Sequence, residues 1–168
     1  MYSGVNIANY FIEKSFDQGN LLTPMQVLKL AYIAHGWYLA TQDEPLLSEA
    51  VQAWKYGPVV PSVYRMYKDF GRDEITSTRF NPALRDEYSD LKSDANTIDV
   101  LDRVYMKYGC LDGLQLSALT HAPDTPWDIT WNHSGGNQRE GVVIPNNLIK
   151  DHYKQKAIEN RRRAANKQ

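Results

Sequence analysis

The chain has 168 residues, of which 42% are hydrophobic and 23% are charged, and its formal net charge is −1 at pH 7. A chain of this length can form one domain that buries about 70% of its unfolded surface, and the composition is that of an ordinary globular protein. No run approaches eighteen consecutive apolar residues, the N-terminal segment has no basic region followed by an apolar run, and Cys110 is the only cysteine. We therefore expect a cytoplasmic protein without a membrane span, a secretion signal or an intrachain disulfide bond.

The N-terminal part of the sequence predicts two helices. Ser3 can cap a helix that ends at Gly19, because apolar residues between them recur at helical spacing. Thr23, Pro24 and Gln26 form a capping box with proline in the first turn, which is a strong start signal. One apolar face follows, made of Leu28, Ala31, Tyr32, His35 and Leu39. We expect this second helix to be central to the core, with His35 packed and hydrogen-bonded rather than catalytic.

A sharp bend follows the second helix. Residues 49–54 alternate loosely enough to predict a short strand, and Gly57, Pro58 and Pro61 then force the chain to change direction. Pro61 can begin another helix. Residues 72–76 are predicted to form a second short strand.

The C-terminal half predicts three further helices. The first covers residues 94–108, the second is short and is capped by Asp112 with Gln115 in the box position, and the last begins near Asn146. Residues 122–141 form the longest irregular section, and their tryptophans argue against disorder.

The charge is unevenly distributed along the chain. Residues 150–168 contain seven lysines and arginines and two carboxylates, or +5, which leaves −6 for the rest because the total is −1. Such a basic end is most often a solvated helix terminus whose cations suit the helix dipole. It could also touch an acidic partner or nucleic acid.

Catalytic and metal-binding patterns are weak. His121, Asp124, Asp128 and His133 have ligand chemistry, but no spacing places two ligands on one helical face. Ser117 and His121 are four residues apart on a predicted helix, which is a common coincidence. There is no Gly-x-Ser-x-Gly elbow and no phosphate-binding glycine loop. We therefore predict no catalytic residue, no metal and no cofactor. A small hydrolase or metal-dependent enzyme stays an alternative, because catalytic groups are assembled in space.

Three blocks of sequence together resemble a known family. They are Leu28-Lys29-Leu30-Ala31-Tyr32, then the run from Ala53 to Pro61 with Val63-Tyr64-Arg65, then Leu116-Ser117-Ala118-Leu119-Thr120-His121 with Pro126-Trp127. Their order and spacing are similar to those of the Panacea domain, the SocA-like and phage-associated antitoxin family. The resemblance covers roughly residues 5–153, so we expect residues 1–153 to form this domain and 154–168 to form a basic C-terminal helix end or tail. It implies a non-catalytic protein that binds and neutralises a toxin. One branch of the family implies instead a proteolytic adaptor, which delivers its toxin to an ATP-dependent protease.

The candidate partner-binding or signature residues come from these blocks: Lys29, Tyr32, Trp54, Tyr56, Gly57, Pro58, Tyr64, Thr120, His121 and Trp127. Two roles are open for them, since an aromatic-rich bend can hold the fold together or can serve as a pre-organised docking site. Lys29 is expected to be a solvated lysine or a charged contact to the partner. Thr120 and His121 are expected to cap the short helix and tether the following loop.

The sequence therefore predicts a mainly α, compact single domain with a small two-stranded β element near the Gly-Pro bend. The predicted function is that of an antitoxin that binds its cognate toxin directly. Direct nucleic-acid binding is not expected, because the chain is nearly neutral and lacks a broad basic face.

Overall fold

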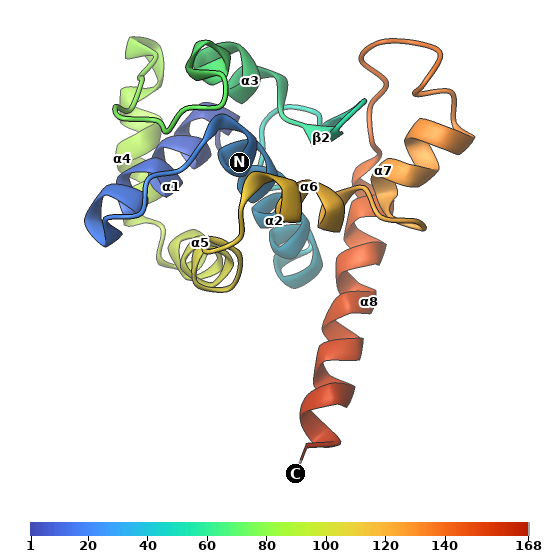
Figure 1. The fold of residues 1–168 in the computed structure, drawn as a ribbon. Helices are drawn as coiled ribbons and strands as arrows, with labels where there is room; N and C mark the ends of the chain where they lie inside the picture. Colours follow the sequence, from blue (N-terminus) through green and yellow to red (C-terminus); the bar gives the residue numbers. More distant parts are fainter. Residues whose placement is uncertain (168) are drawn as a thin grey trace.

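The computed structural model describes residues 1–167 as a set of helices around one central helix, with a single short hairpin (Figure 1). The main helices are α1 (Gly4–Gln18), α2 (Pro24–Gln42), α3 (Pro61–Tyr67), α4 (Arg85–Ser93), α5 (Ala95–Tyr108), α6 (Gly113–Thr120), α7 (Pro126–Asp128) and α8 (Asn146–Ala165). The strands are β1 (Gln52–Trp54) and β2 (Gly57–Val59). Short helical turns are η1 (Lys68–Phe70), η2 (Pro82–Leu84) and the π-helical turn η3 (Ile129–His133). The predicted fold class, mainly α with a small two-stranded sheet, is confirmed.

Helix α2 lies at the centre of the molecule. It contacts α1, α3, α5, α6, α8 and β2, so it is surrounded on every side. This explains why its sequence is apolar around most of its circumference. Its predicted capping box is present, because Thr23 accepts from the Gln26 N–H at 3.4 Å and Gln26 Oε1 accepts from the Thr23 N–H at 2.8 Å. The predicted central place of this helix is confirmed.

Helix α8 packs along α2 through its first half. Tyr153 is buried and its ring meets those of Tyr32 and Trp37 edge to face. His35 is fully buried, and its Nε2 lies 2.9 Å from Asn146 Oδ1 at the start of α8. Burial is the main cause that lowers the pKa of His35. The expectation of a packed, hydrogen-bonded histidine is confirmed.

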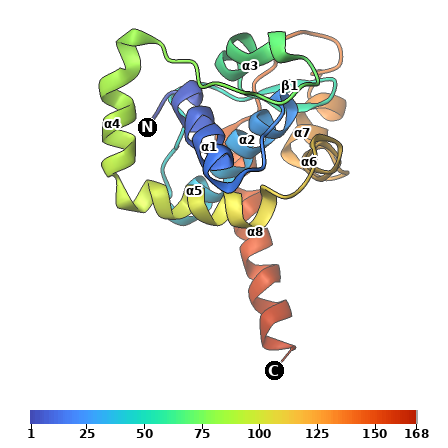
Figure 2. The same cartoon turned by 60° about the vertical axis from the view of Figure 1, so that its left-hand side comes forward.

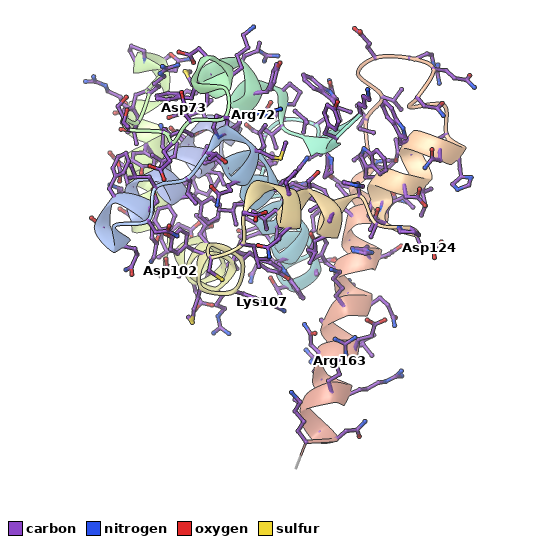
Figure 3. The ribbon with its side chains drawn as sticks, in the orientation of Figure 1. Arg72, Asp73, Asp102, Lys107, Asp124 and Arg163 are labelled. Carbon is purple, nitrogen blue, oxygen red and sulfur yellow. The ribbon has the colours of Figure 1, made fainter. Side chains whose placement is uncertain are left out.

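The rest of α8 extends away from the body of the protein, as both views show (Figures 1 and 2). Residues 158–167 are all exposed, and Arg163 lies on this projecting part (Figure 3). The excess of positive charge is therefore carried by a solvated helix end, whose cations suit the C-terminal dipole. Among residues 1–167 no helix combines the length and the apolar character that a membrane crossing requires.

The two strands are consecutive, contrary to the pairing predicted from sequence. β1 pairs antiparallel with β2 across the turn residues Lys55 and Tyr56. Residues 72–76, predicted as the second strand, are irregular. Their apolar residue Ile75 is buried, and its N–H donates to Leu22 O at 2.8 Å. That bond holds the segment against the connection between α1 and α2, away from β1, which was its predicted partner.

Two regions are more helical than the sequence suggested. The weakly periodic stretch after residue 76 contains η2 and α4, and the irregular section 122–141 contains α7 and η3. These helices are short, with three to nine residues each, so periodicity is a weak signal for them.

The close contact between α2 and α8 gives the first prediction. Gly36 lies where an added Cβ would overlap the buried ring of Tyr153. Helix propensity alone favours Gly36→Ala by roughly 1 kcal/mol, whereas overpacking costs about 1–3 kcal/mol. We expect Gly36→Ala to lower the free energy of unfolding measured in urea.

The control is a double-mutant cycle. Adding Tyr153→Ala makes room for the new methyl group. The double variant should therefore lose less free energy of unfolding than the sum of the losses of the two single variants. Additive losses would mean that the ring does not oppose the methyl group.

Candidate functional site

The candidate site is the hairpin of residues 52–59, which three helices hold in place. The backbone carbonyl groups of Trp54, Tyr56 and Pro58 each accept one hydrogen bond from a side chain. The donors, which we call the carbonyl clamp, are Trp127 on α7, Ser117 on α6 and Lys29 on α2.

The carbonyl of Pro58 lies on the edge of β2 that faces away from β1. The opposite residue, Ala53, donates its N–H to Val142 O at 2.9 Å rather than to β2. Pro58 itself has no N–H, so its position leaves only a carbonyl to satisfy on the outer edge. Lys29 Nζ donates to that carbonyl at 3.0 Å. The bond replaces the partner that another strand would have supplied.

Lys29 is 2% exposed, and this corrects the sequence expectation. It is neither solvated nor available to a partner, because α2 is enclosed by the other elements. Its amine reaches the hairpin beside Gly57, where an added Cβ would lie 2.5 Å from Lys29 Nζ. Burial lowers the pKa of Lys29 to about 7, since the apolar surroundings disfavour the charged ammonium.

Ser117 fixes the turn of the hairpin. Its hydroxyl donates to Tyr56 O at 2.9 Å, and its Oγ lies 3.2 Å from His121 Nδ1. Because a hydroxyl has one hydrogen, the ring nitrogen of His121 acts as the donor to Ser117 Oγ. Ser117 is 5% exposed. The four-residue spacing of Ser117 and His121 places both side chains on one helix face, where they form a chain of hydrogen bonds to the Tyr56 carbonyl.

Aromatic rings complete the support. Trp127 Nε1 donates to Trp54 O at 2.7 Å, and the Trp127 ring stacks on Trp131 with centroids 5.7 Å apart. The His121 ring meets Trp127 edge to face. Trp131 was expected to be ordered but was not among the candidate site residues, although its spacing of four residues from Trp127 is the signal for such a contact.

The structure brings most of the candidate residues together and divides them into two groups. Lys29, Gly57, Pro58, Thr120 and Trp127 are buried around the hairpin. Thr120 bonds within its own helix through Leu116 O, and His121 is the C-cap residue of α6. These residues can fix a shape but present little surface.

The side chains of the second group reach the surface. Tyr56 is 64% exposed and Tyr64 is 37% exposed, while Trp54 is half-buried with its ring against Tyr64 at 4.8 Å. Tyr32 belongs to neither group: it is 1% exposed and lies between α2 and α8.

In the part of the chain that the structure describes, no group of three or more His, Cys, Asp and Glu side chains is placed to hold a metal ion. Asp128, one of the suggested ligands, instead accepts from Asn132 at 2.6 Å and from the Asp124 N–H at 3.0 Å.

The fold and the carbonyl clamp thus define a small helical domain in which side chains of three helices hold one aromatic hairpin. The family described as "Antitoxin SocA-like, Panacea domain" matches residues 27–128, which include the hairpin and all three donors of the clamp. The protein named "Antitoxin SocA" from Caulobacter vibrioides (strain NA1000 / CB15N) is 30% identical over 151 residues, covering 88% of this chain and 80% of that relative. The chain belongs to the SocA-like Panacea domain family. No solved structure matches it significantly.

Crowding at Gly57 gives the second prediction. Its φ of 115° is strained for any residue with a side chain, and a Cβ would displace Lys29 Nζ. We expect Gly57→Val to lower the melting temperature and the free energy of unfolding, by about 2 kcal/mol or more.

The matched control is Gly19→Val. Gly19 also has a positive φ, of 66°, but no atom lies within 4 Å of its added Cβ. The control therefore reports the cost of a positive φ without a close contact, at a φ that side chains tolerate better than 115°. A loss for Gly57→Val no larger than that of Gly19→Val would contradict the role of the close contact with Lys29.

The buried amine gives the third prediction. The pKa of Lys29 is about 7 in the folded state against 10.5 for an ordinary lysine. Between these values the unfolded chain holds more protons, so the free energy of unfolding should rise with pH, by at most about 1.4 kcal/mol per unit. Above pH 10.5 the amine is uncharged in both states, so its burial costs no charge desolvation. The free energy of unfolding falls as the pH drops from 10.5 to about 7 and changes little further below that.

Urea unfolding of the wild type and Lys29→Met at pH 7, 8 and 9 measures this slope. We expect the variant to lack the rise, while Lys68→Met, a change at an exposed lysine, keeps it. Equal slopes for the wild type and Lys29→Met would show that the amine does not stay uncharged in the folded protein.

Proposed function

We propose that this protein is an antitoxin that neutralises a cognate toxin by binding it directly. The observation that carries the proposal is its membership of a family described as SocA-like antitoxins, together with its likeness over most of its length to a protein named as an antitoxin. The carbonyl clamp supports it, because a hairpin fixed in advance loses little conformational entropy when it meets a partner.

Exposed apolar side chains point to the hairpin side of the molecule as the contact surface. Of the eight large hydrophobic residues that are exposed among those described, four lie on the hairpin or on segments that pack beside it. They are Tyr56, Tyr64, Leu114 and Val143. Tyrosine is enriched in the energetic centres of protein interfaces. An interface of about 1,600 Å² can hold a partner with nanomolar affinity or better.

Co-expression tests the proposal. The gene that lies beside the gene for this protein should arrest growth when expressed alone and should become harmless when both are expressed. Purification of the pair should give a soluble complex of fixed stoichiometry. Gly57→Val serves as the control, since loss of the hairpin should abolish rescue. Continued growth arrest in cells that contain the soluble complex would refute neutralisation by binding.

Two variations of this experiment separate the other candidate functions. Delivery to a protease requires that rescue disappears in cells that lack ATP-dependent proteases, whereas sequestration predicts that rescue persists. An enzyme predicts that His121→Ala folds and still binds the partner but no longer rescues. Direct sequestration predicts instead that any folded variant that binds also rescues.

A further inference from the structure

A groove lies between the hairpin and the loop that follows η3. Its volume is about 600 Å³, and its walls are residues 52–55 with Trp131 and residues 136–141. Figure 1 shows the loop that precedes α8 rising beside the hairpin, and the two views agree. None of the roles described so far uses this space.

The backbone on both sides of the groove is held in place. The carbonyl clamp fixes the hairpin wall. On the loop wall, the N–H groups of Gly136 and Asn137 each donate at 3.0 Å, to Thr130 O and Trp131 O respectively. The Ala53 N–H, which donates to Val142 O, then ties the two walls together. The groove is therefore formed before any ligand arrives, and binding to it costs little ordering.

The lining combines aromatic surface with unpaired positive charge. Trp54 and Trp131 are partly buried tryptophans, and Lys55 and Arg139 are exposed cations. Neither cation takes part in an ion pair within residues 1–167, and Lys55 Nζ lies over the Tyr56 ring at 5.4 Å. Glu140 is the one carboxylate in the lining, so the groove carries two cations against one anion.

Both edges of β1 are already used, by β2 and by residues 142–144. A ligand in the groove therefore cannot add a strand to the sheet, and side chains must recognise it. Asn137 and Gln138 are exposed in the lining and offer amide groups for the backbone of an extended peptide.

The charge of the whole protein argues for a peptide rather than a polynucleotide. Residues 1–149 carry a net −6, and the compensating +5 lies in residues 150–168 at the end of the chain. Tight binding of a polynucleotide needs cationic contacts to many of its phosphates. The negative charge of residues 1–149 would instead repel a polynucleotide along its length. A short segment with one or two carboxylates meets only the local positive charge.

We propose that the groove between residues 52–55 and 136–141 binds an extended acidic segment of the toxin, with its carboxylates at Lys55 and Arg139 and an apolar side chain against Trp54 and Trp131. This inference rests on the proposed function and names the part of the surface that carries it.

Charge reversal tests the assignment. Lys55→Glu and Arg139→Glu should each weaken toxin binding by about tenfold, measured by calorimetry on the purified partners at 50 mM salt. Glu140→Lys, at the neighbouring position of the same loop, should leave binding unchanged or tighter, because an acidic ligand gains a cation. Arg163→Glu makes the same charge change on the projecting part of α8 (Figure 3) and should leave affinity within about twofold.

The outcomes separate this inference from the proposed function. If the wild type binds and neutralises the toxin but Lys55→Glu and Arg139→Glu bind equally well, the groove is not the site and the function stands. Weaker binding by Glu140→Lys would also overturn the assignment. A wild type that fails to bind the toxin refutes both. A short single-stranded oligonucleotide that binds the wild type but not Arg139→Glu, without competing with the toxin, would identify a nucleic-acid groove instead.

Discussion

The hydrogen bond from Lys29 to the carbonyl of Pro58 determines where the hairpin can lie. Left unpaired in the core, that carbonyl would cost about 1–3 kcal/mol, and no neighbouring strand is present on its side. A lysine on the central helix can reach it because Gly57 leaves the space open. The arrangement buries an amine, and burial lowers the pKa of Lys29 to about 7, so much of the cost of a buried charge is avoided by losing the proton.

The aromatic bend could hold the fold together or serve as a docking site, and the structure assigns these two roles to different atoms of the same segment. Backbone carbonyls of the hairpin point toward the helices of the clamp, while the side chains of Tyr56 and Tyr64 reach solvent. Packing therefore constrains Lys29 and Gly57 strongly, whereas the exposed positions can change without moving the backbone. A surface of this kind can be altered to suit a partner while the fold is kept.

The parts predicted correctly from sequence depend on neighbours in the chain. The capping box of Thr23 and Gln26 and the helix start at Ser3 are local hydrogen bonds, and the apolar face of α2 is a local pattern. The errors concern long-range contacts. The strand predicted at residues 72–76 failed because Ile75 bonds to Leu22, and Lys29 was misjudged because periodicity cannot show that a helix is covered on all sides. Nothing in the sequence shows that Trp127, Ser117 and Lys29 meet at one hairpin, although each is visible as a residue of a motif.

The groove depends on the same kind of long-range contact, since its walls are separated by about eighty residues of sequence and meet through the bond from Ala53 to Val142. Its backbone is fixed by bonds between main-chain atoms and by the clamp, so none of those bonds requires the side chains of Asn137, Gln138, Arg139 or Glu140. Substitutions at these four positions can therefore change the charge and the hydrogen-bonding groups of the groove without changing its shape. Because binding to a preformed site depends mainly on such complementarity, substitutions in this short loop would alter the choice of partner without changing the motifs that define the family.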